Sequence, residues 1–228
     1  ENIAGTIRPT TLTRYQGAVR IHINPRLGDK PITQVTGKDV QKLYDALASH
    51  GNQITGKGLA SSTIRGIHSM LHEAMDAAKQ AGLIPWNPTE EIPTPKFACK
   101  VKQILTDEQL DIFMAIIQQD DIWHDFFYTE LTTGLRRGEI CGLKWEDFDE
   151  IDGTLKVRRT IHQEKGGKLT AWDTKTAAGA RTIILPPSTV ELLRERQKSA
   201  LTEWIFPDPL RPEQPTRPSA AYNRMKSL

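Results

Sequence analysis

Hydrophobic residues recur at helical spacing through the first 95 positions of the chain. Leu12, Tyr15 and Val19 would share one face of a helix. The Asn24–Pro25 step predicts the end of that helix, because a residue that precedes proline disfavours the helical conformation. Every element that the pattern predicts in this region is a helix. The pattern therefore favours a small helical bundle over residues 1–95.

Two further helices of this bundle are indicated by the residues at their ends. Thr36 with Asp39 predicts the start of one helix, and Ser61 or Ser62 would cap the start of the next. Gly82 suits the C-terminal end of the last helix. The apolar residues that these helices would bury are Val40, Leu43, Leu47, Ile64, Ile67, Leu71, Met75 and Ala78.

The composition changes after the bundle. Four prolines lie between positions 85 and 95 and favour an extended connector, and the three lysines of residues 96–103 follow without an acid. We therefore predict a linker over 96–105 and a second domain over 106–228. Thr106 with Gln109 would form a capping box, and Ser188 with Glu191 would begin a later helix.

The second domain is predicted to mix helices with short strands. Gly153 and Gly166 mark turns between the strands. The expected helices are 106–119, 121–132, 136–144 and 188–200, and the expected strands are 155–161, 169–174 and 181–185. The fold class is therefore α+β, mainly α, with a helical bundle joined to a mixed domain that contains a β-hairpin or three-stranded sheet.

Charge is distributed unevenly, although the net charge is only +2. Residues 106–153 contain 13 acidic and 3 basic side chains, whereas residues 154–185 contain 7 basic and 2 acidic ones. Residues 46–72 contain no acid at all. Local basic stretches of this kind can neutralise phosphates, but they are also found on ordinary solvated surfaces. Charge alone leaves both interpretations open.

Several classes of protein are disfavoured by simple features. The longest apolar runs are far too short to span a bilayer, and the first ten residues lack the order of a signal peptide. Cys99 and Cys141 give neither a disulfide framework nor metal-ligand spacing. We therefore expect no membrane association, no metal, no cofactor and a cytoplasmic location.

Residues 133–139 spell T-G-L-R-R-G-E. A glycine turn there would present Arg136 at the start of a short helix, where free backbone N–H groups favour an anion. The guanidinium adds a permanently charged fork that matches phosphate oxygens, and Glu139 lies one turn further along to orient it. An ordinary charged pair on a surface helix is the alternative.

A second segment carries a basic residue in a turn. Residues 174–185 spell T-K-T-A-A-G-A-R-T-I-I-L, which places Lys175 and Thr176 before the expected strand of Arg181. A lysine on a stiff hairpin can reach a DNA groove and can donate a proton. A surface lysine without a role is the alternative.

The two segments together resemble the tyrosine site-specific recombinases of the phage integrase type, and the subgroup is that of phage or conjugative-transposon integrases. The resemblance covers nearly the whole chain, with a SAM-like core-binding domain at 1–95. It implies that Arg136 grips the scissile phosphate, that Glu139 supports it, and that Lys175 protonates the leaving 5′-oxygen. It further implies duplex DNA as substrate, a 3′-phosphotyrosyl intermediate, a homotetramer on DNA and accessory proteins for integration or excision.

The sequence departs from the family pattern in its later motifs. None of the six histidines is followed by arginine three positions on, and Tyr222 precedes the place where that motif would begin. We therefore interpret the chain as ending before the nucleophilic tyrosine, and we expect it to bind DNA without cutting it. A non-catalytic DNA-binding regulator and a type IB topoisomerase relative remain as alternatives.

Further DNA contacts are predicted from the basic stretches. Around the start of the third helix, hydroxyl and basic groups suit phosphate oxygens. Arg158 and Arg159 would lie on opposite faces of one strand, so at most one of them would face DNA. The full set of predicted DNA-binding residues is Lys57, Ser61, Ser62, Thr63, Arg65, His68, Arg158, Arg159, Thr176 and Arg181.

Overall fold

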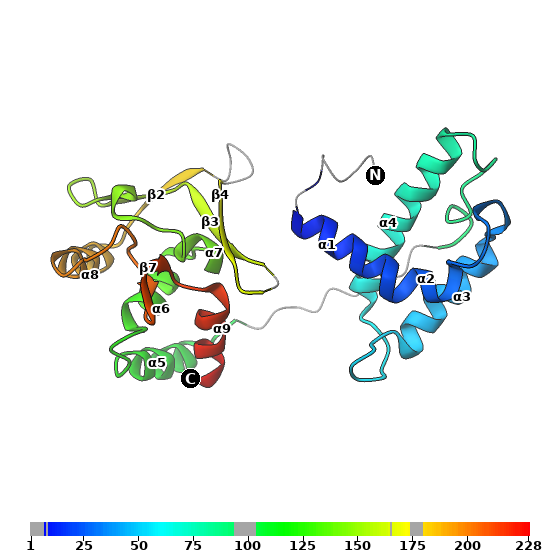
Figure 1. Cartoon of the computed structure of the whole chain (residues 1–228). Helices are drawn as coiled ribbons and strands as arrows, with labels where there is room; N and C mark the ends of the chain where they lie inside the picture. The colour runs from blue at the N-terminus through cyan, green and yellow to red at the C-terminus, as the bar shows by residue number, and fades with distance from the viewer. Residues whose placement is uncertain (1–6, 8, 94–103, 165, 174–179) are drawn as a thin grey trace. The chain divides into compact units, whose positions relative to one another are not determined.

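The computed structural model describes residues 7, 9–93, 104–164, 166–173 and 180–228 (Figure 1). The chain divides into two compact units, residues 1–102 and 103–228, and each has its own hydrophobic core. Most of the linker expected at 96–105 lies outside the described residues, as do Cys99, Lys175 and Thr176. No helix in the described ranges is long and apolar enough to cross a membrane.

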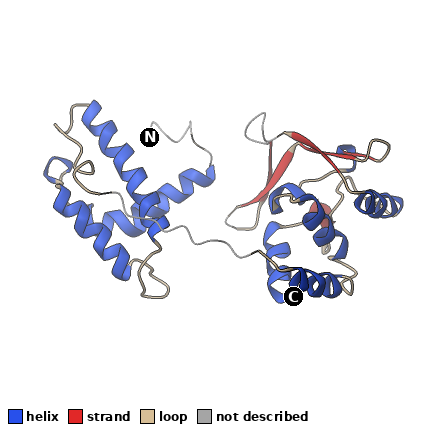
Figure 2. Ribbon diagram, turned by 180° about the vertical axis from the view of Figure 1, so that it is seen from behind, coloured by secondary structure: helices blue, strands red, loops and turns tan. Residues whose placement is uncertain are grey.

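The described part of the first unit is built from helices and turns (Figure 2). Its core forms where the apolar faces of the two longest helices meet. The predicted capping box is present: the Thr36 hydroxyl accepts from the Asp39 N–H, and the Asp39 carboxylate accepts from the Thr36 N–H at 2.9 Å. The elements are α1 (Pro9–Ala18), η1 (Val19–Ile23), α2 (Asn24–Leu27), η2 (Ile32–Gln34), α3 (Gly37–His50) and α4 (Ser61–Gln80).

The prediction that the first helix ends at Asn24–Pro25 is wrong. The helix continues through one π-turn, η1, in which the Asn24 N–H donates to the Val19 carbonyl, and α2 follows directly. The wider turn leaves room for Pro25, which has no N–H and whose ring would clash with the carbonyl four residues earlier in an α-helix. The residues that reach the core are Ala18, Ile23 and Leu27.

The third predicted helix, α4, buries the expected apolar residues but does not begin as expected. Its N-cap is Ala60, whose side chain makes no capping hydrogen bond, so neither Ser61 nor Ser62 is the cap. At the other end Gly82 has φ +71°, in the left-handed region, as its predicted place at the end of the helix requires.

The proline-containing segment after α4 is packed rather than extended up to residue 92. Asn87 is buried, and its amide donates to the Asp76 carboxylate at 2.7 Å. The His72 ring lies 2.7 Å from the Thr89 hydroxyl, which donates to the Asn87 side-chain oxygen. These bonds fasten the segment to α4, so its prolines restrict turns instead of forming a connector.

The second unit contains the remaining helices, which surround a core rich in aromatic rings. The capping box of Thr106 and Gln109 is present at the start of α5. Ser188 is not a cap, because α8 begins at Pro187 and its N-cap is Pro186. The helices are α5 (Asp107–Ile117), α6 (His124–Thr133), α7 (Arg137–Ile140), η3 (Trp145–Asp147), α8 (Pro187–Lys198) and α9 (Pro218–Ser227).

Short antiparallel strands complete the second unit. The strands are β1 (Phe148–Asp149), β2 (Thr154–Val157), β3 (Arg159–Gln163), β4 (Leu169–Asp173), β5 (Arg181–Ile184), β6 (Pro207–Asp208) and β7 (Arg211–Pro215). They form a three-stranded sheet in the order β1-β2-β5 and the two-stranded sheets β3-β4 and β6-β7. The mainly helical α+β fold class and its three-stranded sheet are thereby confirmed.

The strand expected over 155–161 is interrupted at Arg158. Its first half pairs with β5 and its second half pairs with β4, so one stretch of chain changes partner at that residue. In the described residues, β4 and β5 on either side of positions 174–179 therefore belong to different sheets. The break also removes the alternation of faces that was expected for Arg158 and Arg159.

Candidate functional site

Arg136 stands at the junction between α6 and α7. Gly134 ends α6 with φ +62° and ψ +22°, a left-handed conformation that favours glycine. Leu135 is buried and anchors the turn, and Arg136 follows as the N-cap of α7 in an extended conformation. The predicted glycine turn thus places this arginine at a helix start.

Glu139 is a buried carboxylate that receives hydrogen bonds from two arginines. The Arg136 Nη1 donates to Oε1 at 2.8 Å and its backbone N–H donates to Oε2 at 3.1 Å. From β5, Arg181 donates through Nη1 to Oε1 at 3.2 Å and through Nη2 to Oε2 at 2.8 Å. We call these three residues the Glu139 cluster.

The Glu139 cluster keeps its carboxylate ionised and its first arginine accessible. Burial alone would raise the pKa of Glu139, but the hydrogen bonds from Arg181 and Arg136 outweigh burial and lower the pKa to about 2. The Glu139 side chain is 6% exposed, whereas the Arg136 side chain is 78% exposed. An accessible guanidinium on a fixed, charged support is suited to binding an anion such as a phosphate.

The short helix α7 is held close to β3 by two glycines. A Cβ on Gly138 would lie 2.5 Å from the Thr160 hydroxyl and 3.0 Å from the Ile161 carbonyl. A Cβ on Gly142 would lie 3.1 Å from Cγ of Arg159. Gly138 is therefore required for the approach of α7 to the strand, whereas at Gly142 a side chain would only be tight against Arg159.

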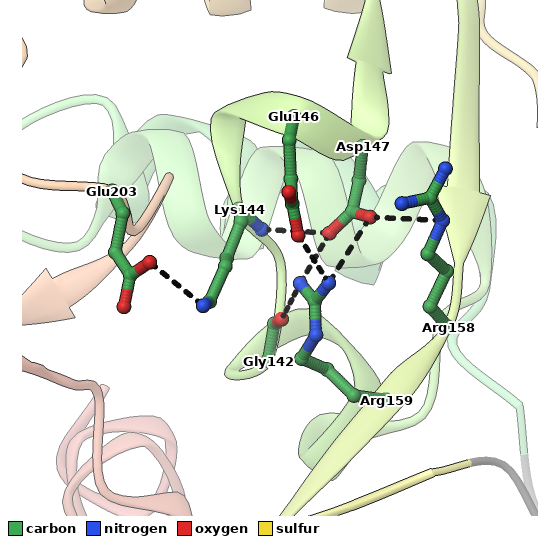
Figure 3. Close-up of polar contacts among 7 residues, drawn as sticks. All are labelled: Gly142, Lys144, Glu146, Asp147, Arg158, Arg159 and Glu203. Carbon is green, nitrogen blue, oxygen red and sulfur yellow. Dashed lines mark hydrogen bonds and ion pairs between the residues drawn. The ribbon is translucent and has the colours of Figure 1, made fainter.

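A second buried carboxylate, Asp147, organises the chain just after α7 (Figure 3). Arg159 Nη1 donates to Asp147 Oδ2, and the same nitrogen donates to the Gly142 carbonyl at 3.2 Å. Arg159 Nη2 donates to Glu146 at 2.7 Å, and the Lys144 N–H donates to Asp147 at 3.0 Å. These bonds tie the end of the α7 region to β3.

The two neighbouring arginines have different places around Asp147. The Arg159 side chain is 14% exposed and donates to the acceptors named above, so the structure gives it a role in holding the chain around Asp147. Arg158 is 49% exposed, and only its Nε, at 3.5 Å, approaches Asp147. In Figure 3 the contact drawn from Arg158 to Asp147 starts at Nε, and the half-exposed side chain leaves guanidinium N–H groups accessible to an external partner.

The predicted contacts of the first unit gather around the start of α4, with one exception. Lys57, Arg65 and the hydroxyl residues at 61–63 are exposed. His68 is buried and its Nδ1 lies 2.8 Å from the Tyr44 hydroxyl, so it packs in the interior of the unit and does not lie with the exposed groups. A cleft of about 350 Å³ opens beside this helix start, and it is lined by Arg14, Tyr15, His22, Ser62, Thr63 and Met70, among others.

Comparison with known families decides how these features are interpreted. Residues 103–228 match the sequence profile described as "Phage integrase family", and residues 1–48 match the one described as "Phage integrase, N-terminal SAM-like domain". The first match alone covers more than half of the chain. The chain belongs to the phage integrase family. The predicted resemblance is confirmed.

Relatives within the phage integrase family are recognisable at moderate identity. A tyrosine recombinase XerC-like protein of Caldanaerobacter subterraneus is 28% identical over 213 residues, which are 87% of this chain and 52% of the relative. The ICEBs1 integrase of Bacillus subtilis is 26% identical over 167 residues, which are 72% of this chain and 45% of the relative. The chain thus spans about half the length of these curated relatives.

Solved integrase structures share the fold. The Tn1549 transposon integrase, in complex with transposon right end DNA, has a TM-score of 0.72 at 25% identity, covering 87% of this chain and 62% of that one. A lambda integrase tetramer bound to a Holliday junction has a TM-score of 0.69 at 22% identity, covering 97% and 60%. At 22% identity, the similarity to the lambda integrase is a similarity of fold alone.

Three features of this integrase-family site were missed from sequence. Arg181 was predicted to contact DNA, but it pairs with Glu139, which lies 42 residues earlier. Asp147 was passed over as part of an acidic run, although it is the buried acceptor for Arg159. Gly138 was not recognised as a packing requirement. Among the described residues, no group of three or more His, Cys, Asp or Glu side chains could hold a metal ion.

Proposed function

We propose that this chain is the DNA-binding part and the first catalytic part of a site-specific tyrosine recombinase. The observation that carries the proposal is the Arg136–Glu139 pair, because it presents an accessible guanidinium at a helix start inside the segment that matches the family. Residues 1–95 would be the core-binding domain, 96–105 a linker, and 106–228 the first portion of the catalytic domain. The whole protein would integrate or excise a mobile element in a bacterial cell.

The proposed reaction is a pair of transesterifications. A tyrosine hydroxyl attacks the scissile phosphorus, the bond to the 5′-oxygen breaks, and a 3′-phosphotyrosyl link forms. The 5′-hydroxyl of a partner strand then attacks that link and releases the tyrosine. Arg136 would spread the charge of the five-coordinate phosphorus, and Lys175 would give a proton to the leaving 5′-oxygen. These roles need no metal and no cofactor.

Exchange between two DNA sites requires several copies of the protein, so we propose a homotetramer on the paired sites. The lambda integrase tetramer on a Holliday junction supports that arrangement by similarity of fold. Accessory proteins that direct integration or excision are a further part of the proposal. A binding assay that compares junction DNA with linear duplex tests it, because a regulator or a type IB topoisomerase relative has no need to prefer the junction.

We expect this chain to bind duplex DNA chiefly through phosphate contacts from its exposed basic and hydroxyl groups. Each lost phosphate contact should reduce the slope of log affinity against log salt by about one. The double variant Lys57→Gln/Arg65→Gln should therefore reduce the slope by about two, as measured by fluorescence anisotropy over a range of salt concentrations. Lys79→Gln is the matched control near the opposite end of α4, and it should leave the slope unchanged. A slope near zero for the unaltered chain would contradict the proposal.

Lys175 is expected to matter only when the leaving oxygen needs a proton. In a chain that also carries the nucleophilic tyrosine, Lys175→Ala should slow cleavage of an ordinary phosphodiester by about 10²-fold or more. A substrate with sulfur at the 5′-bridging position should be cleaved at nearly the normal rate, because a thiolate leaves without protonation. The measurement is single-turnover cleavage of both substrates. An equal loss on both would make Lys175 a positioning contact instead.

A further inference from the structure

Arg181 uses both terminal nitrogens on one carboxylate. It is the first residue of β5, and its Nη1 and Nη2 bind the two oxygens of Glu139 at 3.2 and 2.8 Å. A two-bond pairing of this kind fixes the plane of the carboxylate as well as its distance. The pair joins β5 to the helix that follows Arg136, across 42 residues of sequence.

We propose that Arg181 is a positioning residue that fixes Glu139, and through it Arg136, and that it is not a contact to DNA. The inference rests on the proposed function. Each of its terminal nitrogens already donates one hydrogen bond to Glu139, and its side chain is only 32% exposed. Arg136 is the opposite case, since it donates one side-chain nitrogen to Glu139 and leaves most of its guanidinium accessible.

The electrostatics of Glu139 explain why a second arginine is needed. A carboxylate buried in the protein interior tends to take up a proton unless charged donors surround it. A pair between residues three apart, in which one partner is largely exposed, contributes little by itself. Arg181 is the first of the hydrogen-bonding partners that lower the pKa of Glu139, ahead of Arg136. The same contact raises the pKa of Arg181.

Losing Arg181 should therefore weaken the hold on Arg136 without removing Arg136. Without the two bonds from Arg181, the plane and position of the Glu139 carboxylate are no longer fixed. Arg136 would then sample more orientations, and fewer of them would match the phosphate. The position of Arg181 also makes β5 the support of the arginine site, and β5 begins directly after the segment that carries Lys175 in the sequence.

The test compares Arg181→Gln with Arg158→Gln, an exposed arginine beside the break in the same sheet. Arg181→Gln should lower single-turnover cleavage by about 10-fold, the smaller end of the range for losing a partner that orients an active-site group. Its DNA affinity and salt slope should not change. Arg158→Gln should reduce the salt slope by about one. Cleavage is measured in a chain that carries the nucleophilic tyrosine.

A spectroscopic measurement separates positioning from general destabilisation. Carbon-detected NMR of the Glu139 carboxyl should show its pKa rising from about 2 toward the ordinary value of 4.5 in Arg181→Gln. Arg181→Lys keeps the charge and should restore part of both the low pKa and the cleavage rate. Thermal unfolding identifies a variant that fails to fold, in which case Arg181→Lys supplies the comparison.

Two outcomes would overturn the inference. A reduced salt slope in Arg181→Gln with an unchanged Glu139 pKa would make Arg181 a DNA contact. Normal cleavage in Arg181→Gln, while Arg136→Ala is inactive, would leave the proposed function standing and remove only the role of Arg181. Normal cleavage in Arg136→Ala would instead contradict the proposed function itself.

Discussion

Replacing Arg136 by alanine should lower the rate of DNA strand cleavage by about 10²–10³-fold. The substitution removes a charged donor whose orientation is set by Glu139 and which remains accessible to a phosphate. The expected loss is confined to the chemical step, because other phosphate contacts would hold the DNA in place. The measurement is single-turnover cleavage in a chain that contains the nucleophilic tyrosine, together with DNA affinity for the same variant.

Arg137→Ala is the matched control for this substitution. Arg137 is the next residue, carries the same charge and is exposed, but its guanidinium lies 5.1 Å from the centre of the Tyr222 ring instead of on Glu139. Its replacement should change cleavage by only a few-fold, about the effect of a weak surface contact. Arg136→Lys should fail to restore the rate. A guanidinium can bind Glu139 through one nitrogen and a phosphate through another, whereas the lysine ammonium has a single nitrogen. Similar losses in Arg136→Ala and Arg137→Ala would contradict the special role of Arg136.

Asp147→Ala should reduce the free energy of unfolding of the second unit by about 3 kcal/mol, the lower end of the usual cost of breaking a buried ion pair, because Glu146 still accepts from Arg159. Its side chain is 1% exposed, and its removal would leave Arg159 and the Lys144 N–H without their main acceptor. Denaturant unfolding followed by tryptophan fluorescence measures the change. The signal reports mainly on the second unit, because that unit holds Trp123, Trp145, Trp172 and Trp204 of the five tryptophans.

Glu146→Ala provides the comparison. Glu146 accepts from the same arginine at 2.7 Å, but its side chain is 58% exposed. An exposed pair of this kind contributes about 0–1 kcal/mol. Equal destabilisation by the two substitutions would contradict the prediction that the buried carboxylate contributes more than the exposed one.

Local patterns in the sequence predicted local structure well. The capping boxes of Thr36 and Thr106 were confirmed, because a capping residue and its partner three positions on specify both bonds themselves. The pairing of Arg136 with Glu139 could be predicted for the same reason. The predicted serine caps at Ser61 and Ser188 were wrong. Both helices begin after a residue, Ala60 or Pro186, whose side chain makes no capping hydrogen bond.

The parts of the site that depend on distant residues could not be predicted. Arg158 and Arg159 were expected on opposite faces of one strand, and that rule fails where the chain leaves one partner strand for another. Whether an arginine in a basic stretch faces DNA or a buried acid depends on what folds against it. Arg181 and Arg159 both form ion pairs with buried carboxylates, and His68 forms a hydrogen bond with Tyr44. The partners in these contacts are distant in sequence, so a local pattern cannot predict them.

The wide turn at η1 has a consequence for how this helix is compared with those of relatives. A π-turn contains one residue more than an α-turn, and one residue corresponds to a rotation of about 100° around the helix axis. The spacing of five between Ala18 and Ile23 keeps both on the core side, and the spacing of four to Leu27 then resumes the normal repeat. Compared with a regular α-helix, residues 19–23 therefore hold one extra residue. A relative that lacks the proline and is one residue shorter here would bury the same residues, and a gap placed anywhere else in this helix would match core positions to solvent-facing ones.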